Sequence, residues 1–169
     1  YIVRELFGGE LSAWEIARHG SAKEALYRGM MKPVLNDRLV PGVTDFLKKH
    51  EESPMALASN AERANVEFVL DNAGLRRFFR VVVDGQQVEC PKPDPQIYLR
   101  TAELLRVAPA DCVVFEDSYS GVEAARAAGA WVVGVETTHY RIAGVDLSIK
   151  DFLQPELETW LDTQLRSLG

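Results

Sequence analysis

Three short polar segments of the sequence could carry chemistry, and each of them follows a run of apolar residues. The first is Ser59, which directly follows the apolar residues 55–58. Its hydroxyl, together with the free N–H groups at the start of a following helix, could bind a phosphate oxygen. Serine at such a position most often only caps the helix, so this residue by itself favours the structural role.

The second segment, residues 90–95, places Lys92 among three prolines. Pro93 disfavours the helical conformation for the preceding residue and keeps Lys92 extended. A lysine held in this way could project into a site and neutralise a phosphoryl oxygen or a group of carboxylates. The alternative is a solvent-exposed lysine in a loop that proline stiffens, which is the commoner situation for lysine.

The third segment is the acidic pair Glu116 and Asp117, which ends an apolar run and precedes Gly121. Two carboxylates close together at the end of a strand repel each other unless a positive group joins them. Mg²⁺ is such a group, because it is bound by one or two carboxylates together with water and phosphate oxygens. Acids that favour the dipole at a helix N-terminus are an equally good interpretation of this pair alone.

Alternating strands and helices must position these three segments. We predict strands at residues 55–58, 80–83, 112–115, 130–135 and 148–149. The helices between them are predicted to begin with Ser59 or Asn60 as N-cap, with Asp94 as N-cap before Pro95, and with a capping box of Ser120 and Glu123. A last helix is expected to start at about Pro155.

The strands are continuously apolar, which is typical of a parallel sheet covered by helices on both faces. Ligands of such sheets lie beyond the carboxyl ends of the strands, where all three polar segments fall. Ahead of the sheet, residues 1–32 are helical in character. Ser12 and Glu15 form a capping box there, and a second helix is predicted over residues 21–31.

Composition excludes several classes of protein. The formal net charge is −6 and no basic stripe is present, so nucleic acid is not an expected partner. No apolar run approaches the roughly 20 residues that span a membrane, and no signal peptide opens the sequence. Two cysteines in 169 residues make neither a disulfide framework nor a zinc site, so we expect a cytoplasmic protein.

Taken together, the segments resemble the second, third and fourth motifs of the haloacid dehalogenase (HAD)-like hydrolases, in residues 56–60, 92–98 and 114–118. Residues 121–129 are also typical of that superfamily. The closest similarity is to the branch of β-phosphoglucomutase and phosphoglycolate phosphatase. The resemblance implies a three-layer αβα Rossmann-like fold, with residues 1–37 as part of a helical cap and residues 38–169 as the core without its first strand.

The resemblance also implies a function: a Mg²⁺-dependent phosphohydrolase that acts on a small phosphate ester through an aspartyl-phosphate. Ser59 and Lys92 would be catalytic, because serine binds the transferring phosphoryl group and lysine balances its charge. Substrate binding is assigned to Ser59 and Asn60. Arg63, just inside the helix after Ser59, could also reach the phosphate, but a solvated arginine on the helix face is an equally good interpretation of this residue. The pair Glu116 and Asp117 would hold the Mg²⁺ ion.

One part of the family pattern is absent from the sequence. The first motif is an apolar strand followed by Asp-x-Asp, and no such motif occurs in residues 1–169. We expect it upstream of Tyr1, so residues 1–169 alone are predicted to be inactive and poorly stable. A sugar-phosphate mutase and a catalytically inactive binding protein stay open as alternatives. A phospho-receiver module is disfavoured, because receivers place their acids before the lysine.

Overall fold

The computed structural model describes residues 12–137 and 142–167, and its strands form two parallel sheets. The first sheet pairs β1 (Ala56–Ala58) with β2 (Val81–Val83). The second has the order β3 (Val113–Glu116), β4 (Trp131–Val135) and β5 (Leu147–Ile149). All five predicted strands therefore exist within about one residue of their expected bounds, and every pairing is parallel.

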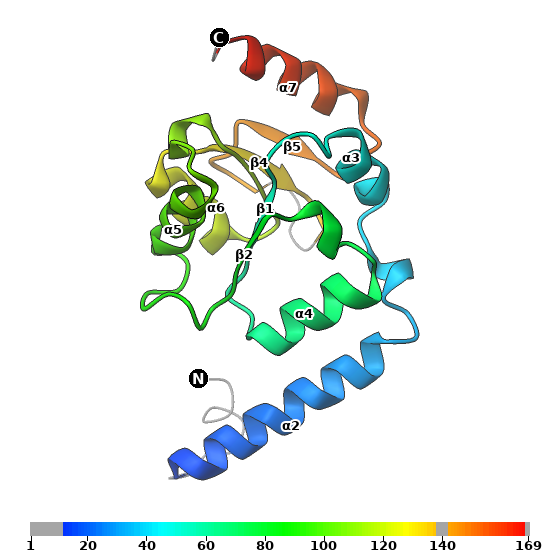
Figure 1. Cartoon of the computed structure of the whole chain (residues 1–169), viewed down its shortest axis with the longest axis vertical. Coiled ribbons are helices and arrows are strands. Elements are labelled where there is room, and N and C mark those ends of the chain that lie inside the picture. The colour runs from blue at the N-terminus through cyan, green and yellow to red at the C-terminus, as the bar shows by residue number, and fades with distance from the viewer. Residues whose placement is uncertain (1–11, 138–141, 168–169) are drawn as a thin grey trace.

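Three helices connect successive strands: α4 (Arg63–Asn72), α5 (Gln96–Leu105) and α6 (Tyr119–Ala128). Helix α3 (Val43–Lys49) precedes β1, and α7 (Pro155–Ser167) follows β5. Short 3₁₀ turns lie at Asn36–Arg38, Arg76–Phe78 and Pro109–Asp111. In Figure 1, α5 and α6 lie together on one side of the strands, whereas α3 and α4 lie on the other side.

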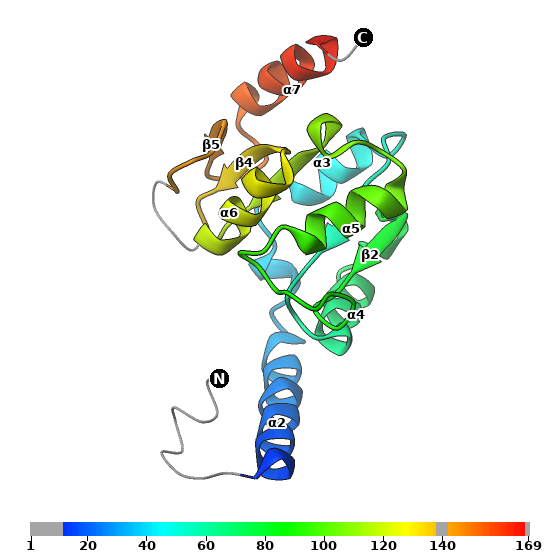
Figure 2. The same ribbon diagram turned by 90° about the vertical axis from the view of Figure 1, so that its left-hand side faces the viewer.

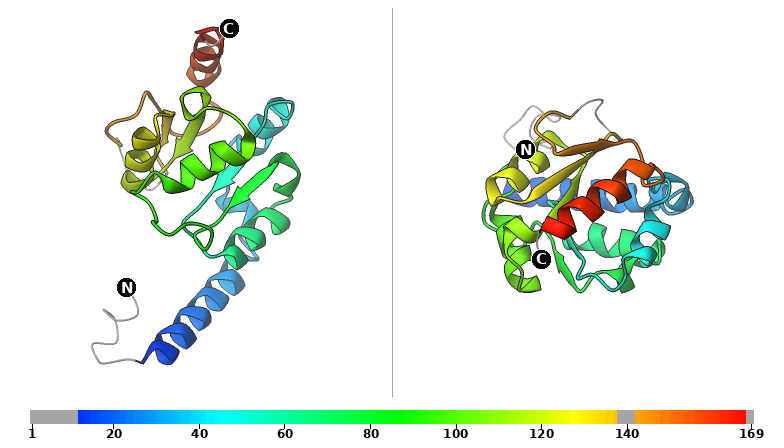
Figure 3. Two further views of the ribbon diagram at one scale, coloured as in Figure 1. Left: turned by 60° about the vertical axis from the view of Figure 1, so that its left-hand side comes forward. Right: turned by 90° about the horizontal axis from the view of Figure 1, so that it is seen from above.

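Alternate side chains of the strands enter different cores, which makes the architecture three-layered. Val83 and Val132 are fully buried against α5 and α6. Val133, the next residue along β4, instead packs with Phe46 of α3 and with Leu157 of α7. Figure 3 shows the two helical layers from two further directions. Burial of both faces confirms the predicted α/β class and explains why the strands are continuously apolar.

One long helix, α2 (Ala13–Met31), precedes the sheets and projects away from them (Figure 2). The predicted capping box of Ser12 and Glu15 is confirmed at its start. The separate helix predicted over residues 21–31 is wrong, because Gly20 and Ser21 continue the same helix. Within the described residues, no helix is both long and apolar enough to cross a membrane.

Three predicted helix starts are displaced. Helix α4 begins after Glu62 and not after Ser59 or Asn60, while α5 begins one residue later than expected, with Pro95 as N-cap. The predicted capping box of Ser120 is wrong: Ser118 caps α6 and accepts a hydrogen bond from the Gly121 N–H.

Arg28 joins α2 to α4 through two hydrogen bonds. Its guanidinium donates to Glu62 Oε1 at 3.0 Å and to Asn65 Oδ1 at 2.6 Å. Asn65 is buried, and its amide in turn donates to Glu24 of α2. The long helix is therefore attached to the core close to the loop that follows β1.

Candidate active site

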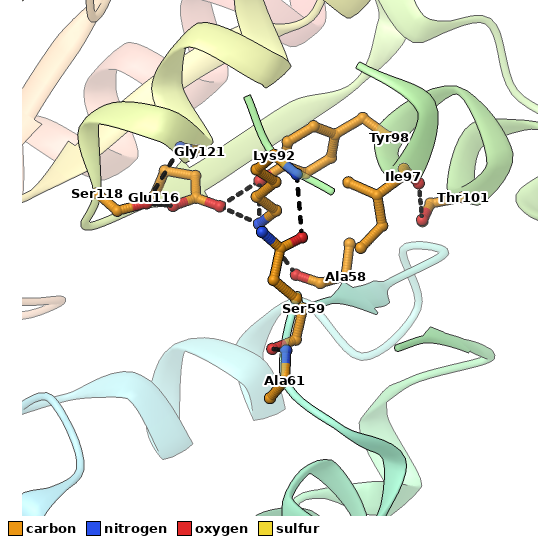
Figure 4. Close-up of polar contacts among 11 residues, drawn as sticks. Ala58, Ser59, Ala61, Lys92, Ile97, Tyr98, Thr101, Glu116, Ser118 and Gly121 are labelled. Atoms are coloured by element: carbon orange, nitrogen blue, oxygen red, sulfur yellow. Dashed lines mark hydrogen bonds and ion pairs between the residues drawn. The ribbon is translucent and has the colours of Figure 1, made fainter. Parts of the chain in front are cut away.

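The Lys92 ammonium lies at the centre of the polar residues that the sequence singled out (Figure 4). It donates to the Ala58 carbonyl at the end of β1 (3.3 Å) and forms an ion pair with Glu116 Oε1 at the end of β3. Both charged side chains are 8% exposed. The structure thus brings the lysine segment to the carboxyl ends of both sheets and excludes the alternative of a solvent-exposed lysine.

Tyr98 of α5 is a third member of this site, and the sequence did not single it out. Its hydroxyl lies 2.8 Å from Lys92 Nζ and donates to Glu116 Oε1. Burial raises the pKa of this hydroxyl, and the negative charge of Glu116 raises it further, so the group stays a proton donor. The sequence did contain a signal for this residue: Tyr98 lies in the helix that follows the lysine segment, and a buried tyrosine normally requires a hydrogen-bond partner for its hydroxyl.

Glu116 accepts from three donors of the protein. Its Oε1 receives Lys92 and Tyr98, and its Oε2 accepts from the Ser118 hydroxyl at 3.1 Å. The side chain is packed against Gly121 of α6, where an added Cβ would overlap with the carboxylate. The structure therefore supports a role for Glu116 as the buried counter-ion of Lys92.

Gly121→Ala is expected to lower the free energy of unfolding by about 1–3 kcal/mol, because three donors hold the carboxylate that the new methyl would displace. Urea denaturation measures the effect. The matched control is Gly20→Ala in α2, where nothing lies within 4 Å of an added Cβ. That change should stabilise the helix by roughly 0.5–1 kcal/mol. Equal changes in the free energy of unfolding of the two variants would contradict the packing described for Glu116.

Ser59 and Asn60 form the turn after β1. The Ser59 hydroxyl oxygen accepts from the Ala61 N–H at 3.1 Å, which leaves its proton available to a ligand. Asn60 Oδ1 accepts from the backbone N–H of Lys92 at 3.1 Å. Gly85 packs so closely on the Asn60 backbone that a Cβ would collide with it. Asn60 therefore connects the turn to the lysine loop, in addition to its predicted contact with substrate.

Arg63 is not drawn into this cluster by any contact in the described part of the chain. Its side chain is 66% exposed and donates to Glu67 on its own helix at 2.8 Å. This hydrogen bond raises the pKa of the guanidinium, which stays charged in any case. Binding of substrate by Arg63 stays a prediction.

Asp117, unlike Glu116, is exposed, and its Oδ2 accepts from the Thr137 hydroxyl at 3.1 Å. Among residues 12–137 and 142–167, no group of three potential metal-ligating side chains is present. The site consequently fits Mg²⁺ in part: Asp117 offers a hard oxygen ligand, whereas Glu116 is occupied by protein donors. Such an ion would need water, phosphate or a further carboxylate to complete its shell.

Comparison with known proteins identifies the family of the chain. The sequence profile of the haloacid dehalogenase-like hydrolase family matches residues 4–129, which is well over half of the chain. The chain therefore belongs to the haloacid dehalogenase-like hydrolases.

Individual relatives are phosphatases and mutases. The chain is 37% identical to fructose-1-phosphate phosphatase YqaB of Escherichia coli over 128 residues, which cover 75% of the chain and 67% of that protein. It is 31% identical to β-phosphoglucomutase of Bacillus subtilis over a region that covers 78% of the chain and 58% of that protein. The crystal structure of β-phosphoglucomutase from Clostridium difficile has the same fold, with a TM-score of 0.84 at 23% identity, covering 98% of the chain and 74% of that protein. The chain spans only part of the curated relatives that it matches, for example 34% of a bifunctional riboflavin kinase/FMN phosphatase of Arabidopsis thaliana and 67% of YqaB.

Proposed function

We propose that this chain forms the greater part of a Mg²⁺-dependent phosphatase for small phosphorylated metabolites that works through an aspartyl-phosphate. One observation carries the proposal: the Lys92 ammonium is held between the carboxyl ends of β1 and β3, beside Ser59. A buried cation next to a free hydroxyl donor is suited to a phosphoryl group that gains charge on its oxygens. Sugar phosphates are the first substrates to test, since YqaB is named for one.

In this reaction the residues of the chain orient the phosphoryl group and stabilise its charge. Ser59 donates its hydroxyl proton in a hydrogen bond to one phosphoryl oxygen, and Lys92 neutralises a second oxygen together with the attacking carboxylate. Asn60 holds the lysine loop through the Lys92 N–H. Phosphoryl transfer depends mainly on such positioning and charge stabilisation.

The nucleophilic aspartate comes, in this proposal, from a strand outside residues 1–169 that pairs between β1 and β3. The backbones of Met55 and Ser59 form hydrogen bonds with residues at the two ends of β2. The alternate residues Ala56 and Ala58 therefore direct their backbone N–H and C=O groups to the edge of β1 that faces away from β2. No described residue adds a strand there, and the edge of β3 opposite β4 is also unpaired among the described residues. The unpaired edges of β1 and β3 lie on either side of Lys92. A strand that ends in the nucleophilic aspartate could pair with both edges.

Asp117 is proposed as the ligand through which this chain would hold Mg²⁺ directly, and Glu116 would reach the ion through water. When bound, the ion neutralises the charge of the phosphoryl group and the nucleophile. Asp117 is exposed toward solvent, so a hydrated cation can reach its carboxylate.

The test is hydrolysis of a panel of small phosphate esters with and without Mg²⁺, by the chain expressed with the residues encoded before Tyr1. Asp117→Asn is expected to lower kcat by about 10²- to 10³-fold, because an amide cannot balance the charge of the ion. Asp162→Asn on α7 removes the same charge far from the site and should leave kcat unchanged. Activity that survives chelation of divalent ions, or survives Asp117→Asn, would contradict the proposed metal ligand.

A sugar-phosphate mutase is the second candidate, since the chain is 31% identical to β-phosphoglucomutase of Bacillus subtilis. A mutase returns the phosphoryl group to the sugar, whereas a phosphatase releases it to water. Product analysis with a hexose 1-phosphate separates the two: inorganic phosphate supports the phosphatase, and hexose 6-phosphate supports the mutase.

A further inference from the structure

Three oxygen atoms from three different elements surround the Lys92 ammonium. They are the Ala58 carbonyl of β1 at 3.3 Å, the Tyr98 hydroxyl of α5 at 2.8 Å and Glu116 Oε1 of β3. An ammonium has three protons to donate, so this set satisfies it completely. Of these three oxygen atoms, only the Tyr98 hydroxyl comes from a residue to which the proposed function gives no role.

We propose that Tyr98 is a positioning residue, whose hydroxyl accepts from Lys92 and donates to Glu116 and thereby holds the ammonium at the junction of β1 and β3. Its consequence for catalysis rests on the function proposed above. The hydroxyl closes a triangle with the ion pair, since Tyr98 contacts both charged partners and they contact each other. Without it, Glu116 would have one donor fewer and Lys92 one acceptor fewer.

The hydroxyl, and not the ring, is the part that fixes the lysine. Lys92 Nζ lies 4.7 Å from the centroid of the Tyr98 ring, a contact that phenylalanine would keep. A ring centroid attracts a cation over a broad area, whereas a hydrogen bond constrains its direction. Tyr98→Phe therefore removes the constraint while keeping the packing and the cation–π contact.

The core of the protein makes Tyr98 a rigid support. Its neighbour Ile97 is fully buried, and Thr101 and Ala102 are buried one turn further along α5. The helix packs on β1, β2 and α6 at once. The hydroxyl is consequently held by a helix that cannot shift without disturbing the first sheet and α6, and precise sites need supports of this kind.

The test compares Tyr98→Phe with Thr101→Val, a matched control on the same helix. Thr101 donates its hydroxyl to the Ile97 carbonyl of its own helix at 2.6 Å, so the control removes a buried hydroxyl that does not touch the lysine (Figure 4). In protein labelled with ¹⁵N-lysine, the Lys92 ammonium should give a proton–nitrogen signal protected from exchange, assigned by its loss in Lys92→Met. Tyr98→Phe should broaden or abolish this signal, whereas Thr101→Val should preserve it.

Kinetics provide the second measurement. Tyr98→Phe is expected to lower kcat by about 10- to 100-fold with little change in KM, which is the usual effect of losing a supporting hydrogen bond around a site. Unchanged kcat together with an unchanged ammonium signal would overturn the proposal. If no ester is hydrolysed by the unaltered protein, the proposed function fails, and the ammonium signal still decides the role of Tyr98. If Tyr98→Phe does not fold, the contact is tested in the unaltered protein by a nuclear Overhauser effect between the Lys92 ammonium and the Tyr98 ring. Absence of this effect would refute the contact.

Discussion

Replacing Lys92 by methionine is expected to abolish most activity and to destabilise the fold at the same time. Methionine keeps the length of the apolar stem but removes the charge. Loss of a positive group that faces the phosphoryl oxygens should lower kcat by about 10²- to 10³-fold. Glu116, 8% exposed, would lose its counter-ion. Breaking a buried ion pair from one side costs about 3–5 kcal/mol of unfolding free energy.

The double variant Lys92→Met with Glu116→Gln separates the two effects. Glutamine is neutral: its carbonyl oxygen can still accept from Tyr98, and its NH₂ group can donate to the Ser118 hydroxyl oxygen in place of the lost acceptor. Replacing both members of a buried pair by neutral groups is often nearly neutral for stability, so the double variant should recover most of the loss. Its activity should stay low, because the catalytic charge is still missing.

Urea denaturation and steady-state kinetics on the two variants measure these outcomes. An exposed pair provides the matched control: Arg63→Met removes a charge whose partner, Glu67, is largely in solvent. Exposed pairs contribute only about 0–1 kcal/mol. If Lys92→Met were as stable as Arg63→Met, or if the double variant regained activity, the role assigned to the buried pair would be wrong.

Residues 1–169 alone are expected to release no phosphate from any ester in the presence of Mg²⁺. The proposed reaction through an aspartyl-phosphate needs an aspartate nucleophile, and none of the aspartates in the sequence lies in an Asp-x-Asp motif. Expression together with the residues encoded before Tyr1 should raise the rate by about 10⁶-fold or more, the usual minimum for an enzyme. The added strand should also stabilise the chain, because it would pair the free edges of β1 and β3.

The control for this experiment is the extended protein with the first aspartate of its Asp-x-Asp motif changed to asparagine. That variant should gain the stability of the added strand without the activity, which distinguishes a missing structural element from a missing nucleophile. Turnover by residues 1–169 alone would refute the proposed mechanism. If the upstream residues contain no Asp-x-Asp, the inactive binding protein becomes the better interpretation.

Much of the fold could be predicted because its signals are local. Continuous apolar runs such as residues 130–135 indicate a strand buried on both faces, and β4 lies there. Helix starts were predicted less well. Ser120 and Ser118 are both plausible caps by sequence, and only the path of the chain out of β3 selects Ser118. A cap depends on backbone direction, which the identity of the residue does not specify.

For the candidate site, the sequence revealed the types of the residues and their order along the chain. It did not reveal which of them contact one another. Ser59, Lys92, Glu116 and Asp117 each follow or approach a predicted strand end, which was enough to indicate phosphate chemistry. The sequence treated the two acids alike. In the structure Glu116 is buried beside Lys92, whereas Asp117 is exposed. Glu116 is the last residue of β3, whereas Asp117 lies beyond the strand, so the two acids meet different surroundings that their neighbouring positions in the sequence do not reveal.

The sequence by itself determined the class of fold, the family and the segments that carry chemistry, because periodicity and short motifs are properties of neighbouring residues. The tertiary structure decided that Lys92 is buried between two sheets, that Glu116 is its counter-ion and that Tyr98 completes the cluster. These contacts join residues that are 6 to 34 positions apart. The physical reason is that an ion pair and its supporting hydroxyl depend on where α5, β1 and β3 meet in space.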